Sequence, residues 1–251
     1  MRTALCLFGK VGGTEGKDNS GGPVDFALCS THYKKHIIEP NNCDVFMHCW
    51  DGEHEQKLVE LYKPKKSMFD MQLPLLEKTV NNERVKINGA SLRAYCRWYS
   101  TKKVIELKQQ YEKENNFKYD WVMLGRYDLM FLVDFDFSKL GDKKFYAAIW
   151  NDPPLAHSKN GTKWISKPNR VNKSLSRTEL ADLWFVMRSD IADEFGKCYD
   201  ILGELCQPSG HCAAWLQAHI AVGPPRENIG FIFYRWWDFE LYRWKVCSCY
   251  R

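Results

Sequence analysis

Arg126 and Asp128 are charged residues within an otherwise apolar stretch, YDWVMLGRYDLMF, at residues 119–131. Charged side chains are almost never fully buried without partners. Because they directly follow the apolar run WVMLG, we expect them to bind a polar or charged partner at the end of a buried strand. Asp128 could bind a divalent cation that also contacts phosphate oxygens, and Arg126 could clamp a phosphate or nucleotide. The alternative is an ion pair that closes the strand end, and composition favours neither reading.

Three further short apolar runs also end in glycine or polar residues, as parallel strands buried on both faces do. TALCLF (3–8) ends at Gly9, CDVFMHCW (43–50) at Asp51, and KKFYAAIW (143–150) at Asn151 and Asp152. Ligands of open α/β sheets bind outside the carboxyl ends of the strands, so these ends predict one shared crevice. Its glycine N–H groups, arginine and carboxylates suit a nucleoside diphosphate with a bridging metal ion.

The elements between these runs are predicted to be helices, because apolar residues recur at three- and four-residue spacing. The pattern predicts helices from Ser91 to about Glu114, over 189–206, and from Ser209 to about Ala221, with Ser91 and Ser189 as caps. Strands that alternate with helices predict an α/β fold with a mostly parallel central sheet and helices on both faces. Residues 151–177 lack periodicity and could close over a ligand.

Composition narrows the function classes. The chain has 251 residues, 45% of them hydrophobic, and a net charge of +5, which fits a single domain over 1–251. Lys and Arg form no long run, which argues against nucleic acid as a partner. No segment has the roughly 20 apolar residues of a membrane span, and no signal peptide opens the sequence. We therefore expect a soluble, cytoplasmic protein whose ten cysteines are mostly reduced.

Several motifs together resemble a family of small glycosyltransferases of the GT-A type, encoded by large algal DNA viruses and by some bacteria and protists. The resemblance covers roughly residues 3–220 and is best over 119–131, which resembles the family's pattern YD-x-[VI]-x-x-x-R-x-D. It implies a GT-A-like nucleotide-binding domain whose donor part spans about 1–150 and whose acceptor part spans about 151–251. The other motifs are ALCLFGKVGG, CDVFMHCWD, YKPKKSMFDMQ and ADLWFVMRSDIADEF.

The resemblance implies a nucleotide-sugar donor, a UDP-sugar first of all, and a glycan or glycoprotein acceptor. In GT-A folds an acidic DXD element holds a divalent cation, Mn²⁺ or Mg²⁺, on the diphosphate. This chain has Arg126-Tyr127-Asp128 at that place, which leaves Asp128 as the implied ligand and does not imply a strict need for metal. His219 could complete the shell of the cation. Further donor contacts are implied for Phe8, Gly9, Lys10, Val11, Ser91 and Arg93.

Asp182 in ADLWFV is the candidate general base, because the resemblance places an acidic residue there, near the acceptor and the anomeric carbon. Asp152 is the second candidate. A purely structural role is the alternative for Asp182, and likewise for His211 and His219, which lie eight residues apart. His48 and Asp51 could touch the donor sugar, and Trp236 or Trp237 the acceptor.

Two other functions remain open from the sequence. One is another nucleotide-binding α/β enzyme, such as a nucleotidyltransferase, although FGKVGGTEGK matches neither GxGxxG nor the P-loop. The other is a non-catalytic sugar-binding module, in which the carboxylates at the strand ends could be removed without loss of binding.

Overall fold

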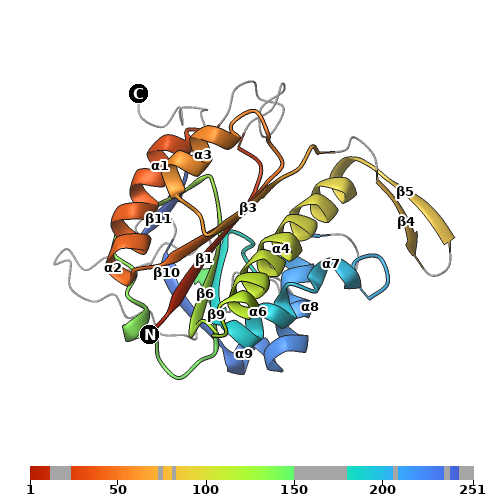
Figure 1. Ribbon diagram of the computed structural model, residues 1–251. Helices are drawn as coiled ribbons and strands as arrows, with labels where there is room; N and C mark the ends of the chain where they lie inside the picture. Colours follow the sequence, from red (N-terminus) through yellow and green to blue (C-terminus); the bar gives the residue numbers. More distant parts are fainter. Residues whose placement is uncertain are drawn as a thin grey trace, which may run out of the picture.

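The centre of the molecule is a seven-stranded sheet with the strand order β10-β8-β9-β6-β1-β2-β3 (Figure 1). The computed structural model describes residues 1–11, 24–72, 76–80, 83–149, 180–205, 209–234 and 238–242. Because helices pack on both sides of this sheet, the predicted α/β fold is confirmed. The strands of the sheet are β1 (Thr3–Gly9), β2 (Asp44–Cys49), β3 (Lys66–Phe69), β6 (Trp121–Arg126), β8 (Phe145–Ile149), β9 (Trp184–Arg188) and β10 (Ile229–Tyr234).

The sheet is mostly parallel, as predicted. Strand β1 pairs in parallel with β2 and β6, β2 with β3, and β8 with β10. Strand β9 lies between β6 and β8 and runs antiparallel to both, which the sequence did not indicate. Because Trp184 pairs with Gly125, the residues just before β9 lie at the same edge as the residues just after β6.

The two faces of the sheet are covered by different helices (Figure 1). Leu5 and Leu7 of β1 face the side of α1 and α3, whereas Cys6 and Phe8 face the side of α4, α6 and α8. The helices of the first side are α1 (Phe26–Tyr33), a π-helical turn (Lys34–Ile38), α2 (Glu39–Asn41) and α3 (Glu55–Tyr62). Those of the second side are α4 (Gly89–Glu114), α6 (Ser189–Phe195), α7 (Cys198–Ile201), α8 (His211–Val222) and α9 (Pro225–Asn228).

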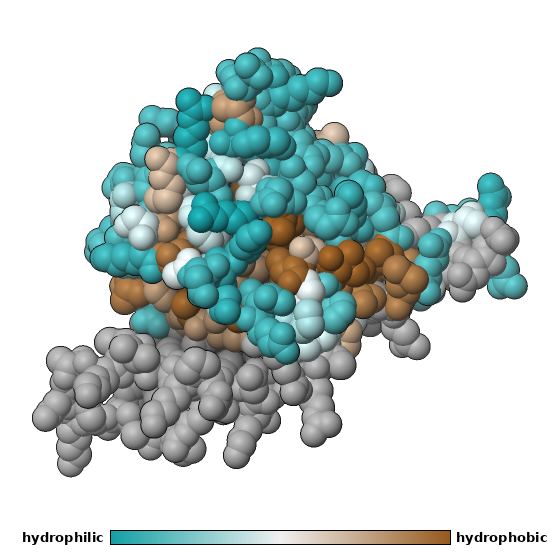
Figure 2. Space-filling view, turned by 90° about the horizontal axis from the view of Figure 1, so that it is seen from below, coloured by the Kyte–Doolittle hydropathy of each residue, from teal (hydrophilic) through white to brown (hydrophobic). Residues whose placement is uncertain are grey.

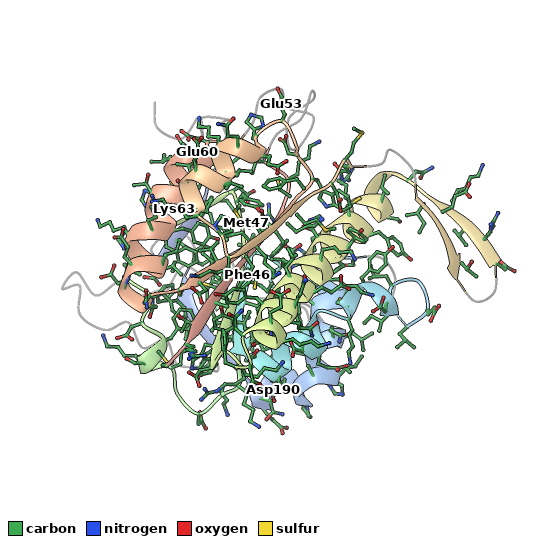
Figure 3. The ribbon with its side chains drawn as sticks, viewed as in Figure 1. Phe46, Met47, Glu53, Glu60, Lys63 and Asp190 are labelled. Atoms are coloured by element: carbon green, nitrogen blue, oxygen red, sulfur yellow. The ribbon has the colours of Figure 1, made fainter. Side chains whose placement is uncertain are left out.

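Apolar side chains of the strands point into the two core layers, and charged side chains lie on the outer helices (Figure 3). Phe46 and Met47, neighbours on β2, belong to the two opposite core layers, as alternation along a buried strand requires. Glu60 and Lys63 on the α3 side are exposed, and so is Asp190 in α6. The smaller elements are the antiparallel pairs β4 (Leu76–Val80) with β5 (Glu83–Ile87) and β7 (Leu129–Phe131) with β11 (Phe239–Leu241), and a 3-10 turn (Phe137–Lys139).

Two helix predictions need correction. The long helix α4 begins at Gly89, two residues before Ser91, so Ser91 is not its cap. The helix predicted over 189–206 is broken after Phe195, and α7 starts at Cys198. At the break Gly196 lies against α4, where a Cβ atom would be 3.0 Å from Ile105 Cγ2. The predicted end of α4 at Glu114 and the predicted helix after Ser209, which is α8, are confirmed.

Ser189 does not cap α6, because its hydroxyl takes part in a buried ion cluster. Lys108 of α4 is fully buried and lies 3.1 Å from Glu112 Oε2, and it also pairs with Asp193 of α6. The Ser189 hydroxyl accepts a hydrogen bond from Lys108 and donates one to Glu112. The cluster thus satisfies buried charges while it ties α4 to α6.

We predict that Lys108→Met lowers the free energy of unfolding by about 3 kcal/mol, because it removes the buried cation and leaves Glu112 and Asp193 with only the exposed Lys118 as cationic partner. Lys102→Met, on the same helix, removes the half-exposed pair with Asp200 and should cost less than about 1 kcal/mol. Urea denaturation of both variants measures the difference. Equal losses would contradict the stabilising role given to the buried cluster.

The surface gives two further facts. Among the described helices, none is both long and apolar enough to cross a membrane. Seen from below, the molecule is largely hydrophilic, with one group of apolar side chains exposed near the middle of that face (Figure 2). On the helices, Ile220 of α8 is 46% exposed.

The cysteines in the described ranges are free thiols, as expected.

Candidate functional site

The carboxyl end of β6 carries a bidentate ion pair. Arg126 Nε donates to Asp128 Oδ1 at 2.9 Å and Arg126 Nη2 donates to Asp128 Oδ2 at 2.7 Å. The side chain of Arg126 is 15% exposed and that of Asp128 is 0% exposed. The expectation that both side chains lie at the rim of a crevice is therefore wrong for Asp128. Its burial is tolerated because two charge-assisted hydrogen bonds replace the lost hydration.

Neighbouring tyrosines fix the backbone around this pair. The hydroxyl of Tyr33, from α1, donates to the carbonyl of Arg126 at 2.9 Å. Gly125 allows this approach, since a Cβ atom there would collide with the same hydroxyl. The hydroxyl of Tyr127 donates to the carbonyl of His48 at 3.3 Å, which joins the end of β6 to the end of β2.

Asp182 reaches the same edge because β9 runs antiparallel to β6. Its carboxylate Oδ2 lies 3.7 Å from Nε of Arg97, a residue of α4, and its Oδ1 lies 3.9 Å from Nδ1 of His211, the first residue of α8. Gly210 leaves space for it, because a Cβ atom at that position would overlap the carboxylate. Three segments distant in sequence thus meet around one carboxylate.

The electrostatics of this group favour the charged form of Asp182. Burial raises the pKa of Asp182, but the positive charges of Arg97 and Arg126 and the proximity of His211 outweigh it, so the pKa lies below its usual value. Asp182 is therefore ionised and a weak base in this arrangement. Burial lowers the pKa of Arg97 to about 10, so Arg97 remains a cation at neutral pH.

Arg97 is held more by stacking than by hydrogen bonds. Its guanidinium lies 3.6 Å from the ring centroid of Trp98 and 4.5 Å from that of Phe8. Its Nη1 donates to the hydroxyl of Thr101 at 2.7 Å. Its Nε is buried, and the described residues provide no hydrogen-bond acceptor for it. Asp182 Oδ2, 3.7 Å from Nε, compensates this buried cation as an ion pair rather than through a hydrogen bond.

The first loop starts at this edge, beside α4. The amide of Gly9 donates to the hydroxyl of Ser100 at 2.8 Å, and the carbonyl of Gly9 accepts from the amide of Trp50 at 2.9 Å. Gly9 and Lys10 are half-buried, whereas the side chains of Phe8 and Val11 are buried. Gly9 and Lys10 can therefore contact a ligand through side chain or backbone, and Phe8 acts through its ring contact with Arg97.

The other predicted residues lie as follows. Ser91 and Arg93 are exposed near the start of α4, and Arg97, one turn later, is the arginine that reaches Asp182. His219 is exposed near the end of α8, two turns beyond His211, so His211 is the histidine beside Asp182. Asp152, Trp236 and Trp237 lie outside the described residues.

Sequence reasoning missed Arg97 and did not place His211 beside Asp182. Arg97 lies in the segment YCRWY, between aromatic residues, and so carries the same signal as Arg126, a cation within an apolar run. His211 had the correct residue type, but its place beside Asp182 depends on the antiparallel direction of β9.

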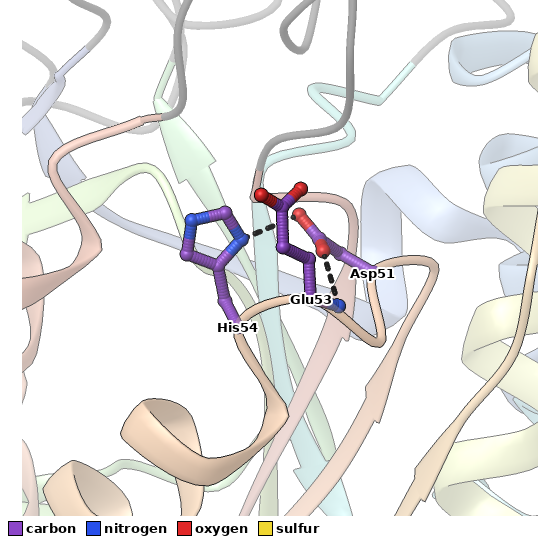
Figure 4. A group of neighbouring side chains, drawn as sticks. All are labelled: Asp51, Glu53 and His54. Atoms are coloured by element: carbon purple, nitrogen blue, oxygen red, sulfur yellow. Dashed lines mark hydrogen bonds and ion pairs between the residues drawn. The ribbon is translucent and has the colours of Figure 1, made fainter.

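One group among the described residues has the composition of a metal site. Asp51, Glu53 and His54, between β2 and α3, offer ligand atoms within 4.8 Å of one another (Figure 4). Asp51 Oδ1 accepts from the Glu53 amide and Oδ2 lies 3.0 Å from His54 Nδ1, so these bonds also explain the group as a turn that leads into α3. Asp128 does not fit a cation as it stands, because both of its oxygens accept from Arg126.

The comparisons with known proteins assign no family. No protein-family model matches the chain, and no curated protein matches it. Among solved structures, it is similar to a nucleoside-diphosphate-sugar pyrophosphorylase from Vibrio cholerae RC9, with a TM-score of 0.48 and 10% sequence identity, over 94% of this chain and 93% of that one. A likeness of this size does not bear on activity, so the site is judged by its own residues.

We predict that Asp182→Asn lowers the free energy of unfolding at pH 7 by about 2 kcal/mol, because the ionised carboxylate is stabilised by neighbouring cations. A carboxyl group whose pKa is lowered by folding contributes stability above its unfolded pKa of about 4, and loses it as the pH falls further. In urea denaturation, the difference between the wild type and the variant should therefore be smaller below about pH 4 than at pH 7. Asp200→Asn, at an exposed ion pair, is the control and should change little at either pH. A difference that is the same at both pH values would contradict this role for the charge.

Proposed function

We propose that the protein is a glycosyltransferase that takes a nucleotide-sugar donor, with a UDP-sugar favoured, and transfers the sugar to a glycan or glycoprotein acceptor. The observation that carries the proposal is the meeting of two cations, Arg97 and Arg126, with the carboxylate of Asp182 at the carboxyl edge of a mostly parallel sheet. Ligands of open α/β sheets bind at this edge. The resemblance of the sequence to GT-A glycosyltransferases supports the same assignment.

The proposed donor site has cations on two elements. Burial is the main cause of the lowered pKa of Arg97, and the charge of Arg126 on β6 lies close enough to α4 to lower it a little more. Lys10, in the first loop, lies near Cys96 of α4 and adds a third positive charge. A diphosphate that accepts hydrogen bonds from Arg97 and Arg126 would relieve the repulsion between them. The same contacts would stabilise the charge that develops on the departing diphosphate.

Asp182 is the proposed base in a single displacement. The acceptor oxygen would bond to the anomeric carbon while the bond from that carbon to the phosphate oxygen breaks, and the electron pair leaves with the diphosphate. The proton of the acceptor hydroxyl would pass to the Asp182 carboxylate. Without ligand the arginines hold the pKa of Asp182 low. Bound diphosphate would offset their charge and raise this pKa, so that Asp182 becomes a stronger base when the donor is present.

The proposal does not depend on a divalent cation. A cation on Asp128 would require Arg126 to release both carboxylate oxygens. His219, the second candidate ligand, is exposed and lies two turns from His211, the histidine beside Asp182. The arginines supply positive charge at the leaving group in either case. Mn²⁺ or Mg²⁺ therefore remains a proposed cofactor whose requirement is measured separately.

We predict that calorimetric titration with UDP, GDP, CMP and dTDP shows binding of one nucleoside diphosphate, with UDP first among them. Arg97→Gln should weaken it by roughly tenfold to a hundredfold, since a charge-assisted hydrogen bond contributes about 1.5–3 kcal/mol. The control Arg84→Gln, on the exposed strand β5, should bind like the wild type. Each titration is run with and without Mn²⁺.

Binding that is the same in Arg97→Gln and in the wild type would contradict the site, and no binding to any of the four nucleotides would contradict the function. Asp128→Asn separates the two roles of that carboxylate. If Asp128 is a cation ligand, the variant abolishes the Mn²⁺ dependence of binding. If it is the partner of Arg126, the variant alters affinity equally with and without Mn²⁺.

A further inference from the structure

An aromatic pocket of about 290 Å³ lies beside α4, next to the residues that follow β2 and β3. Its walls come from α4 (Tyr95 and Tyr99), from the residue after β2 (Trp50), and from Tyr199 of α7. Helix α4 packs against both β3 and α7 (Figure 1), so packed elements form part of the wall, and the exposed Met71 after β3 lines the open side. Asp70, directly after β3, is the carboxylate in its wall, and its side chain is 30% exposed.

The rings form walls rather than a flat slot. Tyr199 stands nearly perpendicular to Tyr99 and to Tyr95, with interplanar angles of 76° and 81°. Trp50 and Tyr99 are tilted by 32°, with their centroids 5.1 Å apart. Trp50 and Tyr99 already lie against each other, so a flat base cannot enter between these two rings. A pyranose ring, with one face of C–H groups and hydroxyls around its edge, suits aromatic walls and a single carboxylate.

A chain of hydrogen bonds links Asp70 to the first loop. Asp70 Oδ2 lies 3.0 Å from His48 Nε2, and His48 Nδ1 lies 2.7 Å from the hydroxyl of Ser100, which accepts from the amide of Gly9. Because a carboxylate only accepts, Nε2 carries the proton of a neutral imidazole, and Nδ1 accepts from Ser100. Every donor in the chain then points from Gly9 towards Asp70.

This chain contains a serine, a histidine and an aspartate, but its arrangement does not suit a nucleophile. Ser100 and His48 are both fully buried, so no substrate can reach the Ser100 oxygen. The chain instead fixes the orientation of Asp70 and holds the first loop at a set distance from the pocket. Ser100 and His48 are therefore positioning residues.

We propose that this pocket binds one saccharide ring, with Trp50 and Tyr99 against its C–H face and Asp70 accepting a hydrogen bond from a ring hydroxyl. The volume is at the lower end of the roughly 300–1,000 Å³ typical of ligand sites, which fits a single ring. The inference deepens the proposed function by assigning the acceptor sugar to this pocket. Its test is separate, because binding of a free glycoside needs no nucleotide.

The experiment is saturation-transfer NMR with the methyl glycosides of glucose, galactose and mannose, and with uridine as the probe for a nucleobase. We expect one glycoside to bind with a dissociation constant on the order of 1 mM, as ligands of this size allow. Asp70→Asn should weaken it about tenfold, whereas Asp200→Asn, an exposed aspartate in α7, should not. Leu92→Trp should abolish binding by filling the pocket, whereas Leu107→Trp, on the same helix away from the pocket, should leave it intact.

Three results would overturn the inference. The first is that no glycoside binds to the wild type. The second is that glycosides bind equally to Leu92→Trp and to the wild type. The third is that uridine, rather than a glycoside, binds to the wild type and no longer binds to Leu92→Trp. Failure of the proposed function looks different. Glycoside binding lost in Leu92→Trp, together with no nucleoside diphosphate binding to the wild type, would support the pocket and identify a sugar-binding module without transferase activity.

Discussion

The site depends on one constraint: each buried charge at the carboxyl edge of the sheet must be paired with a buried charge of the opposite sign. The buried carboxylate of Asp128 is compensated by Arg126, which donates a hydrogen bond to each of its two oxygens. Arg97 and Asp182 likewise lie in a largely buried place where each lowers the cost of the other's charge. Since removal of one member leaves an unpaired charge in low dielectric, the four residues must be ordered together. Their elements, α4, β6 and the approach to β9, are thereby fixed at one edge.

Helix α4 carries this order through the rest of the molecule. Near its start, Arg97 and Ser100 serve the charged edge and the first loop, while Tyr95 and Tyr99 line the aromatic pocket. Near its end, Lys108 binds α6 through the buried ion cluster. One rigid helix thus sets the distance between the proposed diphosphate site and the proposed sugar pocket. That geometry is what a transferase needs, because its two substrates must meet at a fixed separation.

Much of the fold was readable from apolar runs and periodicity, because burial on one or both faces of an element leaves a direct trace in sequence. The four predicted strands, the end of α4 at Glu114 and the helix α8 follow from that trace. The direction of β9 does not, since a buried strand has the same composition in either direction. The break at Gly196 and the role of Ser189 were also missed, because both arise from contacts with α4.

The sequence indicated which residues belong to the site better than it indicated what each of them contacts. Arg126 and Asp128 were identified as charges needing an explanation, yet sequence alone did not choose between ligand binding and mutual pairing, and the structure shows the pair. The resemblance implied Arg93 as a donor contact and Arg97 was not considered, whereas in the structure Arg97 is the arginine that reaches Asp182. Such choices depend on which helix face meets the sheet edge, and that is decided by tertiary packing.

A crystal structure of the protein with UDP and Mn²⁺ tests the central claim most directly. The account predicts phosphate oxygens within hydrogen-bond distance of the guanidinium groups of Arg97 and Arg126, at the carboxyl edge beside Gly9, and anomalous scattering would locate any manganese. A nucleotide bound elsewhere, with no phosphate oxygen in contact with Arg97 or Arg126, would contradict the claim that the charged edge is the donor site.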